Sequence, residues 1–147
     1  MDRDYNESRW VLVDTSALVG LFFRDDEWHV PAVRTLENLR RDRKRLLTTS
    51  DVFDETITAL RVWAGHAHAV TAGEVLKANR LVRVAPVGSQ LREIAWRLFK
   101  KYDDQEFSFT DCTSFATMEQ FRIRLAFSFD DDFTQAGYLT LPQGMRS

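Results

Sequence analysis

The chain has 147 residues, of which 44% are hydrophobic and 12% aromatic, and this favours one domain over residues 1–147 with a substantial core. Its formal net charge of −2 excludes a global basic field, so any binding to a polyanion has to come from local clusters of cations. A single cysteine, Cys112, and the lack of an apolar run that could span a bilayer predict a soluble protein of the reducing cytoplasm, without a disulfide, a zinc site or a membrane segment.

The hydrophobic pattern predicts strands that alternate with helices along most of the chain. Short apolar runs indicate strands, and apolar residues three and four positions apart indicate helices. This alternation predicts a three-layer α/β/α fold around a parallel sheet of about four to five strands. In chain order we expect a flexible leader at 1–9, a strand at 10–13, a helix through Phe22, a helix over 29–45, a strand at 46–49, a helix from a cap at Ser50 or Asp51 to near Gly65, a helix over 66–79, a strand at 81–87, a helix over 89–102, a helix capped by Thr110, a strand at 125–129, a short helical turn up to Gly137 and an edge strand at 138–141.

Four acidic residues that are far apart in the sequence fall at one edge of this predicted sheet. The helices that connect parallel strands run opposite to them, so helix N-termini and strand C-termini share an edge. Asp14 and Asp130 follow predicted strands, whereas Glu55 and Asp111 lie in the first turns of predicted helices. Ligands of open α/β sheets bind at this edge, which makes it the candidate site.

Clustered carboxylates repel one another and raise one another's pKa values, so they favour a bound cation. All-oxygen sets of Asp and Glu suit Mg²⁺ or Mn²⁺, which keep several waters and accept phosphate oxygens as further ligands. Such a site orients and activates a water and stabilises negative charge on a scissile phosphate, with two ions if the spacing allows. The four acids therefore predict metal-dependent hydrolysis of phosphodiester bonds.

Each acid also has a structural interpretation, which stays open at this point. Asp14 and Asp111 stand where a side chain caps a helix, and Glu55 is compatible with a solvated helix position. Of the three aspartates at 130–132, at least one belongs to turn chemistry. The joint placement of four acids, and no single residue among them, favours the metal site.

The same positions resemble four short motifs of the PIN-domain family. The resemblance covers almost the whole chain except the leader and the last few residues. Each motif is short and commonplace, but four of them in order at suitable spacing are fairly specific. They are VDTSAL at 13–18, SDVFDET at 50–56, FTDCTSF at 109–115 and FSFDDDF at 127–133, followed by AGY at 136–138.

A small chain of this kind is similar to the toxins of VapBC-type toxin-antitoxin pairs. The resemblance implies a Mg²⁺- or Mn²⁺-dependent endoribonuclease that acts on RNA, forms a homodimer and is inhibited by a small antitoxin whose C-terminal segment covers the acidic groove. It implies that Asp14, Asp111 and Asp130 ligate metal and that Glu55 does so directly or through water. Asp130 is preferred over Asp132 because it directly follows the predicted strand. The supporting residues are Thr15 or Ser16, which would orient Asp14 or a water, together with Thr110 and Asp132.

Three other functions remain as alternatives. A phosphatase of the haloacid dehalogenase type would need a second Asp two positions after Asp14, where this chain has Ser16, and a well-placed Lys is lacking. A PIN-domain nuclease of RNA maturation or surveillance has the same motifs as a toxin. A non-catalytic PIN-like RNA-binding module would be expected to have lost some of the four acids, yet all are present.

Some conspicuous residues are expected to lie outside the site. The cationic run at 40–45 ends a predicted helix before a strand, which places it at the edge opposite the acids and favours a solvated helix end over a substrate contact. His66 and His68 are expected at the surface. Trp63 and Trp96 lie on apolar helical faces, where tryptophans more often anchor a core or an interface than stack on bases.

Overall fold

The computed structural model describes residues 9–143, so the predicted leader lies outside the described residues except for Arg9. The described part contains one sheet of five parallel strands in the order β3-β2-β1-β4-β5, which confirms the predicted α/β class. The strands are β1 (Trp10–Val13), β2 (Arg45–Thr49), β3 (Arg83–Ala85), β4 (Leu125–Phe127) and β5 (Leu139–Leu141).

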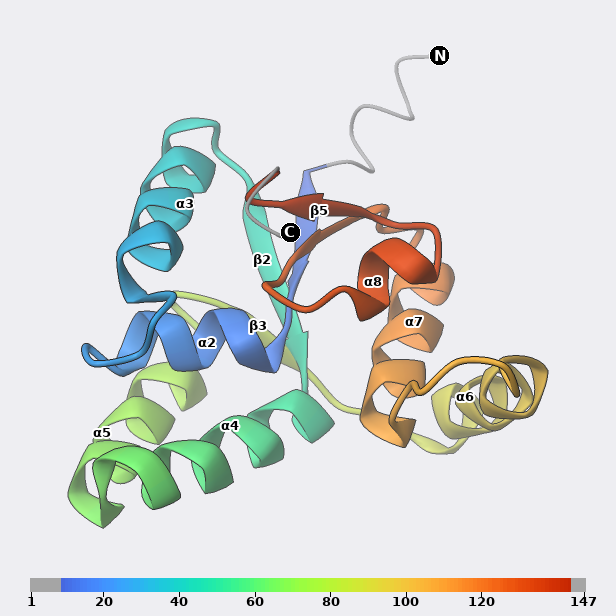
Figure 1. The fold of residues 1–147 in the computed structure, drawn as a ribbon, viewed down its shortest axis with the longest axis horizontal. Coiled ribbons are helices and arrows are strands. Elements are labelled where there is room, and N and C mark those ends of the chain that lie inside the picture. The colour runs from blue at the N-terminus through green and yellow to red at the C-terminus, as the bar shows by residue number, and fades with distance from the viewer. Residues whose placement is uncertain (1–8, 144–147) are drawn as a thin grey trace.

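Helices cover both faces of the sheet, as Figure 1 shows. One face is covered by α2 (Thr15–Phe22), α3 (His29–Arg41), α4 (Ser50–Ala64) and α5 (His66–Lys77), and the other by α6 (Ser89–Lys101), α7 (Phe109–Phe121) and α8 (Asp132–Gln135). None of the helices within residues 9–143 is both long and apolar enough to cross a lipid bilayer.

The central strand shows why this sequence forms two separate cores. Successive side chains of a strand point to opposite faces of a sheet. Val11 and Val13 therefore pack into the core under α2 and α3, whereas Leu12 packs into the core under α6 and α7. All three side chains are fully buried, which is expected of a strand covered on both faces.

Several predicted boundaries were wrong by a few residues. The helix predicted over 29–45 ends at Arg41, because the chain turns at Arg43, whose φ is 57°, and enters β2 at Arg45. The strands predicted at 81–87 and 125–129 are only Arg83–Ala85 and Leu125–Phe127.

Two caps were also misplaced by one or two residues. Thr49, and neither Ser50 nor Asp51, caps α4, since its hydroxyl accepts a hydrogen bond from Val52 N. Ser108, and not Thr110, caps α7 through a hydrogen bond from Asp111 N. Both true caps are the last residues of the preceding segment, where the sequence does not distinguish a helix cap from the end of a strand or loop.

Candidate active site

The candidate site lies where the C-terminal ends of β1 and β4 meet the first turns of α2, α4 and α7. A backbone hydrogen bond joins the ends of β1 and β4, because Asp14 N donates to Phe127 O at 3.0 Å. The buried hydroxyl of Thr48, on β2, donates to Val13 O at 2.7 Å. Asp14 is thus held at the end of the central strand with both neighbouring strands fixed beside it.

Asp14 is the most constrained acid of the site. It is only 5% exposed, and its Oδ2 accepts hydrogen bonds from Ser128 Oγ at 2.9 Å and from Ser16 Oγ at 3.3 Å. Asp14 occupies the N-cap position of α2, and its backbone O accepts from Ala17 N and Leu18 N, but its side chain makes no capping hydrogen bond. Side-chain capping therefore does not account for this carboxylate. Burial raises the pKa of Asp14 to about 6, and the negative charges of Asp130 and Glu55 add to that rise.

Ser128 is a site residue that the sequence prediction missed. Its side chain is 1% exposed, and its hydroxyl donates to Asp14 while accepting a hydrogen bond from Asp130 N at 3.0 Å. Ser16 acts similarly, since its hydroxyl accepts from Phe129 N at 2.9 Å. The two serines therefore fix the turn that carries Asp130 relative to the carboxylate of Asp14. A polar residue between Phe127 and Phe129 in an otherwise apolar run was the available signal.

Glu55 and Thr15 form a direct pair across the site. Glu55 lies on α4, and its Oε1 accepts a hydrogen bond from Thr15 Oγ1 at 2.7 Å. One turn earlier on α4, Asp51 forms an ion pair with Arg92 of α6 at 3.0 Å. Thr15 thus orients Glu55, while Ser16 contacts Asp14, so the two hydroxyls predicted as supporting residues have different partners.

Asp111 is engaged in the N-terminal cap of α7. Its backbone N–H donates to Ser108 Oγ at 2.9 Å, and its Oδ2 accepts from Ser108 N at 3.0 Å, which completes a capping box. The carboxyls of Asp111 and Asp132 also share a hydrogen bond. Burial, followed by that hydrogen bond and the charge of Asp111, raises the pKa of Asp132 to about 7.

Electrostatic interactions connect the four predicted acids, because their charges raise the pKa values of other members of the group. The charges of Asp130 and Glu55 raise the pKa of Asp14, and those of Asp14 and Asp130 raise the pKa of Asp111, for which burial is the larger cause. Asp132 joins this group through Asp111. Thr110, in contrast, lines a neighbouring groove of about 520 Å³ together with Glu55 and Trp63.

The donor set fits a hard divalent cation, because it consists of carboxylates and hydroxyls and includes the strongly buried Asp14. Within residues 9–143, however, no three acidic, His or Cys side chains already converge as a metal-binding group. The hydrogen bonds of Asp111 to Ser108 N and to Asp132 compete with metal ligation by that carboxylate. The strongly buried Asp14 is therefore the best supported member of the set.

Comparison with known families identifies the protein family to which this acidic site belongs. The PIN-domain pattern matches residues 11–138, which span the sheet from β1 to the residue before β5. The chain belongs to the PIN-domain family. This membership rules out the phosphatase of the haloacid dehalogenase type, and it places the four sequence motifs in the fold for which they were predicted.

Individual relatives narrow the class further. The chain is 36% identical over 129 residues to the 23S rRNA-specific endonuclease VapC20 of two Mycobacterium tuberculosis strains, covering 88% of this chain and 95% of that protein. The crystal structure of that toxin, described as cleaving the sarcin-ricin loop, superposes with a TM-score of 0.79 at 35% identity and covers 88% of this chain and 96% of that one. The resemblance to VapC-type ribonuclease toxins is thus confirmed.

Two more distant structures share the fold. VapBC2 of Rickettsia felis, bound to a promoter DNA fragment, has a TM-score of 0.68 at 8% identity and covers 89% of this chain and 96% of that one. FitAcB of Neisseria gonorrhoeae has a TM-score of 0.66 at 17% identity, with coverages of 88% and 95%. At these identities the likeness concerns the fold alone.

The tryptophans on helical faces do not belong to the core. Trp63 is 68% exposed at the end of α4, and Trp96 is 49% exposed on α6, where it stacks on Phe99 with ring centroids 5.9 Å apart. His66 and His68 are exposed, as predicted. A core role for either tryptophan was therefore wrong, and Trp63 instead adds an apolar surface next to Glu55.

Proposed function

We propose that this chain is a Mg²⁺- or Mn²⁺-dependent endoribonuclease that acts as the toxin of a type II toxin-antitoxin pair. The single observation that carries the proposal is Asp14, a carboxylate that is 5% exposed, held by two serines and surrounded by further acids. Burying an unpaired carboxylate is costly for folding, so its presence favours a role in binding a cation. The VapC-type relatives support the same conclusion.

A divalent cation at this edge would supply the positive charge that activates a water and stabilises the phosphate during hydrolysis. Asp14 and Asp130 would hold that cation directly, with Glu55 contributing directly or through a water. Asp111 completes the set once its carboxylate is released from Ser108 N and from Asp132. The carboxylates are oriented by their hydroxyl partners, since Ser128 fixes Asp14 and Thr15 fixes Glu55.

A structured ribosomal RNA loop is the substrate class to test first. A relative with 36% identity is named a 23S rRNA-specific endonuclease, and its structure is described as that of a sarcin-ricin loop cleaving toxin. The proposal places the protein in the cytoplasm, where ribosomal RNA is found. Roles in RNA maturation or surveillance, or in RNA binding without cleavage, are the alternatives that the experiment below separates.

A small antitoxin is the proposed protein partner. Beside the acids, α4 presents Val62 and Trp63, which are 76% and 68% exposed, and both line the groove that also contains Glu55. Exposed apolar anchors next to a catalytic edge suit an inhibitor that covers the acids. We further propose that the toxin is a homodimer.

The test combines cleavage in vitro with growth in cells. Purified wild-type protein should cut an RNA that contains the ribosomal loop in Mg²⁺ or Mn²⁺, and a chelator should stop the reaction. Expression of the wild type should arrest growth, whereas Asp14→Asn should not. Cleavage without growth arrest would favour a maturation or surveillance nuclease, and RNA binding without cleavage would favour the non-catalytic module.

A further inference from the structure

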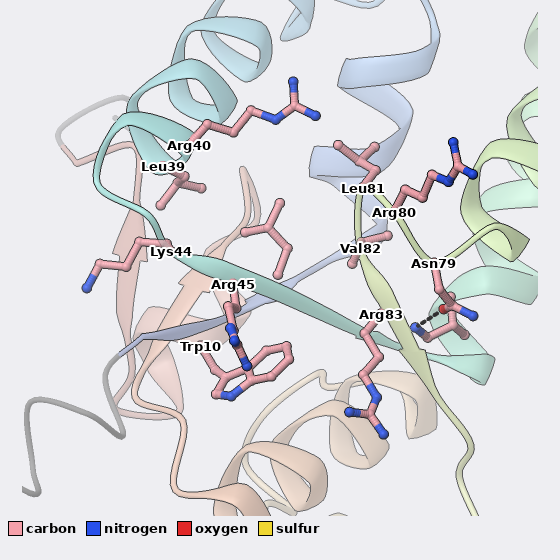
Figure 2. Close-up of a pocket in the computed structure, with 12 residues that line it drawn as sticks. Trp10, Leu39, Arg40, Lys44, Arg45, Asn79, Arg80, Leu81, Val82 and Arg83 are labelled. Carbon is pink, nitrogen blue, oxygen red and sulfur yellow. Dashed lines mark hydrogen bonds between the residues drawn. The ribbon is translucent and has the colours of Figure 1, made fainter.

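A second hollow lies at the opposite edge of the sheet from the acids. It is a groove of about 640 Å³ at the N-terminal ends of the three strands β1, β2 and β3 (Figure 2). The chain segments that form it come from the end of α3 and from the connection between α5 and β3. Its lining residues are Trp10, Leu39, Arg40, Lys44, Arg45, Leu46, Asn79, Arg80, Leu81, Val82, Arg83 and Val84.

The lining of this basic groove is cationic on an apolar floor. Leu39, Leu46 and Val82 are buried beneath it, with at most 7% of each side chain exposed. Five of the twelve lining residues are Arg or Lys, and none of them is acidic. The cations come from two separate stretches, 40–45 and 80–83. The sequence of 40–45 alone favoured a solvated helix end, but the fold places the cations of 80–83 beside it.

The arginines of the groove are not neutralised by the described protein. Arg40, Arg80 and Arg83 are exposed, and they have no carboxylate partner among residues 9–143. The guanidinium of Arg45 lies over the ring of Trp10 at 5.7 Å from its centroid, which fixes one planar cation beside an aromatic surface. Such unneutralised guanidinium groups suit phosphate, which they bind with paired N–H donors.

Figure 2 shows that these side chains fan out rather than converge on one point. Arg45 and Arg83 extend to one side of the sheet edge, with Trp10 beside Arg45, whereas Arg40 and Arg80 extend to the other side. One small anion could not contact all of them. An extended polyanion that crosses the edge could meet them in turn, and this is the geometry of a nucleic-acid backbone.

Two other occupants fit this surface less well. A peptide that adds a strand to the sheet beside β3, its outermost strand, would need free backbone groups on β3. One of them is already occupied, because Val84 N donates to Asn79 Oδ1 at 3.1 Å. A second copy of this chain across a two-fold axis would place the same cations against one another, which opposes association.

We propose that the basic groove binds the phosphodiester backbone of RNA at a second site, separate from the acidic edge. The inference rests on the proposed ribonuclease function only in naming RNA as the polyanion. A strand of five residues such as β2 spans roughly 16 Å, so an RNA that reaches both edges has to be a folded or multi-nucleotide segment. The groove would therefore favour large structured substrates over short ones.

The test measures equilibrium binding of the full chain to a fluorescent RNA stem-loop of about 30 nucleotides, in chelator so that cleavage does not interfere. The full chain is used for the wild type and for every variant. The test variant combines Arg40→Gln, Arg80→Gln and Arg83→Gln. The control combines Arg97→Gln, Lys100→Gln and Lys101→Gln on α6, which makes the same change in net charge outside the groove.

We expect the groove variant to bind RNA at least about tenfold more weakly than the wild type at 0.1 M salt, and the slope of log affinity against log salt to fall by about 2 to 3. The control variant should keep most of the affinity, and both variants should melt near the wild-type temperature. Poly-glutamate of equal charge should bind the wild type weakly and without dependence on the groove.

Three results would overturn the proposal. Unchanged RNA affinity of the groove variant, with loss in the control, would show that the groove is not the contact. If poly-glutamate binds as tightly as RNA, and its binding is lost when the same three arginines are replaced, the ligand is an acidic polypeptide. A change in the monomer-dimer equilibrium caused by the groove variant alone, in sedimentation, would identify a subunit interface. Because no arm depends on catalysis, failure of the ribonuclease proposal remains a separate result.

Discussion

The two ends of one parallel sheet carry opposite charges, although the net charge of the chain is only −2. At the C-terminal ends of the strands lie Asp14, Glu55, Asp111 and Asp130, whereas the N-terminal ends carry the basic groove. Helix dipoles favour this arrangement, because acids suit helix N-termini and cations suit helix C-termini. Composition could not reveal it, since the two clusters nearly cancel.

Among the charged residues of the two edges, Asp14 differs from the arginines of the basic groove in its burial as well as in its charge. Asp14 is 5% exposed, and its raised pKa shows that the folded protein disfavours its charged form. The arginines of the basic groove are exposed and incur no comparable cost. A buried carboxylate that destabilises the folded protein indicates a function, whereas exposed cations do not, so their role has to be tested by binding experiments.

The largest expected effect is the loss of cleavage in Asp14→Asn. Removing a residue that orients a metal ligand costs about 10- to 100-fold in activity, and removal of a ligand itself should cost more than about 100-fold. The measurement is the single-turnover cleavage rate of a ribosomal stem-loop in Mn²⁺. Asp25→Asn, which removes an exposed acid outside the site, is the matched control and should cleave at the wild-type rate. Equal rates for both variants would remove Asp14 from the mechanism.

The same substitution should stabilise the metal-free protein. A pKa raised from 3.8 to about 6 corresponds to roughly 3 kcal/mol of unfavourable free energy when Asp14 is ionised. The folded state then holds its proton more tightly than the unfolded state, so this contribution to stability is present below pH 4, is lost as the pH rises from about 4 to 6, and stays lost above that.

Chemical unfolding in chelator at pH 4 and pH 8 checks this sign. Asp14→Asn should unfold at a higher denaturant concentration than the wild type at pH 8, with little difference at pH 4. Adding Mn²⁺ at pH 8 should stabilise the wild type and leave the variant unchanged, because only the wild type gains a cation that binds the folded state. A variant that is less stable than the wild type at pH 8 would contradict the unfavourable burial of this carboxylate.

A smaller effect is expected from the serines that hold Asp14. Ser128→Ala removes the 2.9 Å hydrogen bond to Asp14 and the acceptor for Asp130 N, so the cleavage rate should fall by about 10- to 100-fold. Ser16→Ala removes a longer bond of 3.3 Å and should cost less. Because the hydrogen bond from Ser128 lowers the pKa of Asp14, the pKa of Asp14 in the metal-free protein, measured by titration in chelator, should be higher in Ser128→Ala than in the wild type. The opposite order of the two variants would refute this assignment.

The sequence predicted the fold and the acidic edge well because both follow from topology. Asp14, Glu55, Asp111 and Asp130 could be placed at one edge once the strands and helices were recognised, since parallel strands leave few other arrangements. What it missed depends on side-chain direction. Ser128 reads as part of a strand, although β4 ends at Phe127 and the serine turns its hydroxyl toward Asp14.

The basic groove illustrates a second reason for failure. The cations at 40–45 looked like an ordinary helix end because the other two arginines of the groove lie far along the chain, Arg80 just before β3 and Arg83 at its first residue. Only the pairing of β2 with β3 brings the two stretches together. Periodicity within one segment cannot reveal a site that two segments share.

The smallest expected effect concerns stability at the basic edge. Arg80→Gln with Arg83→Gln should change the free energy of unfolding by less than about 0.5 kcal/mol, because these side chains are exposed and have no described carboxylate partner. Arg92→Gln at the acidic edge breaks the ion pair with Asp51 and should cost up to about 1 kcal/mol. Urea unfolding in 0.15 M salt compares the two variants. If the double variant is the more destabilised, the arginines of the groove contribute to folding, and the contrast between the unfavourably buried Asp14 and these exposed arginines fails.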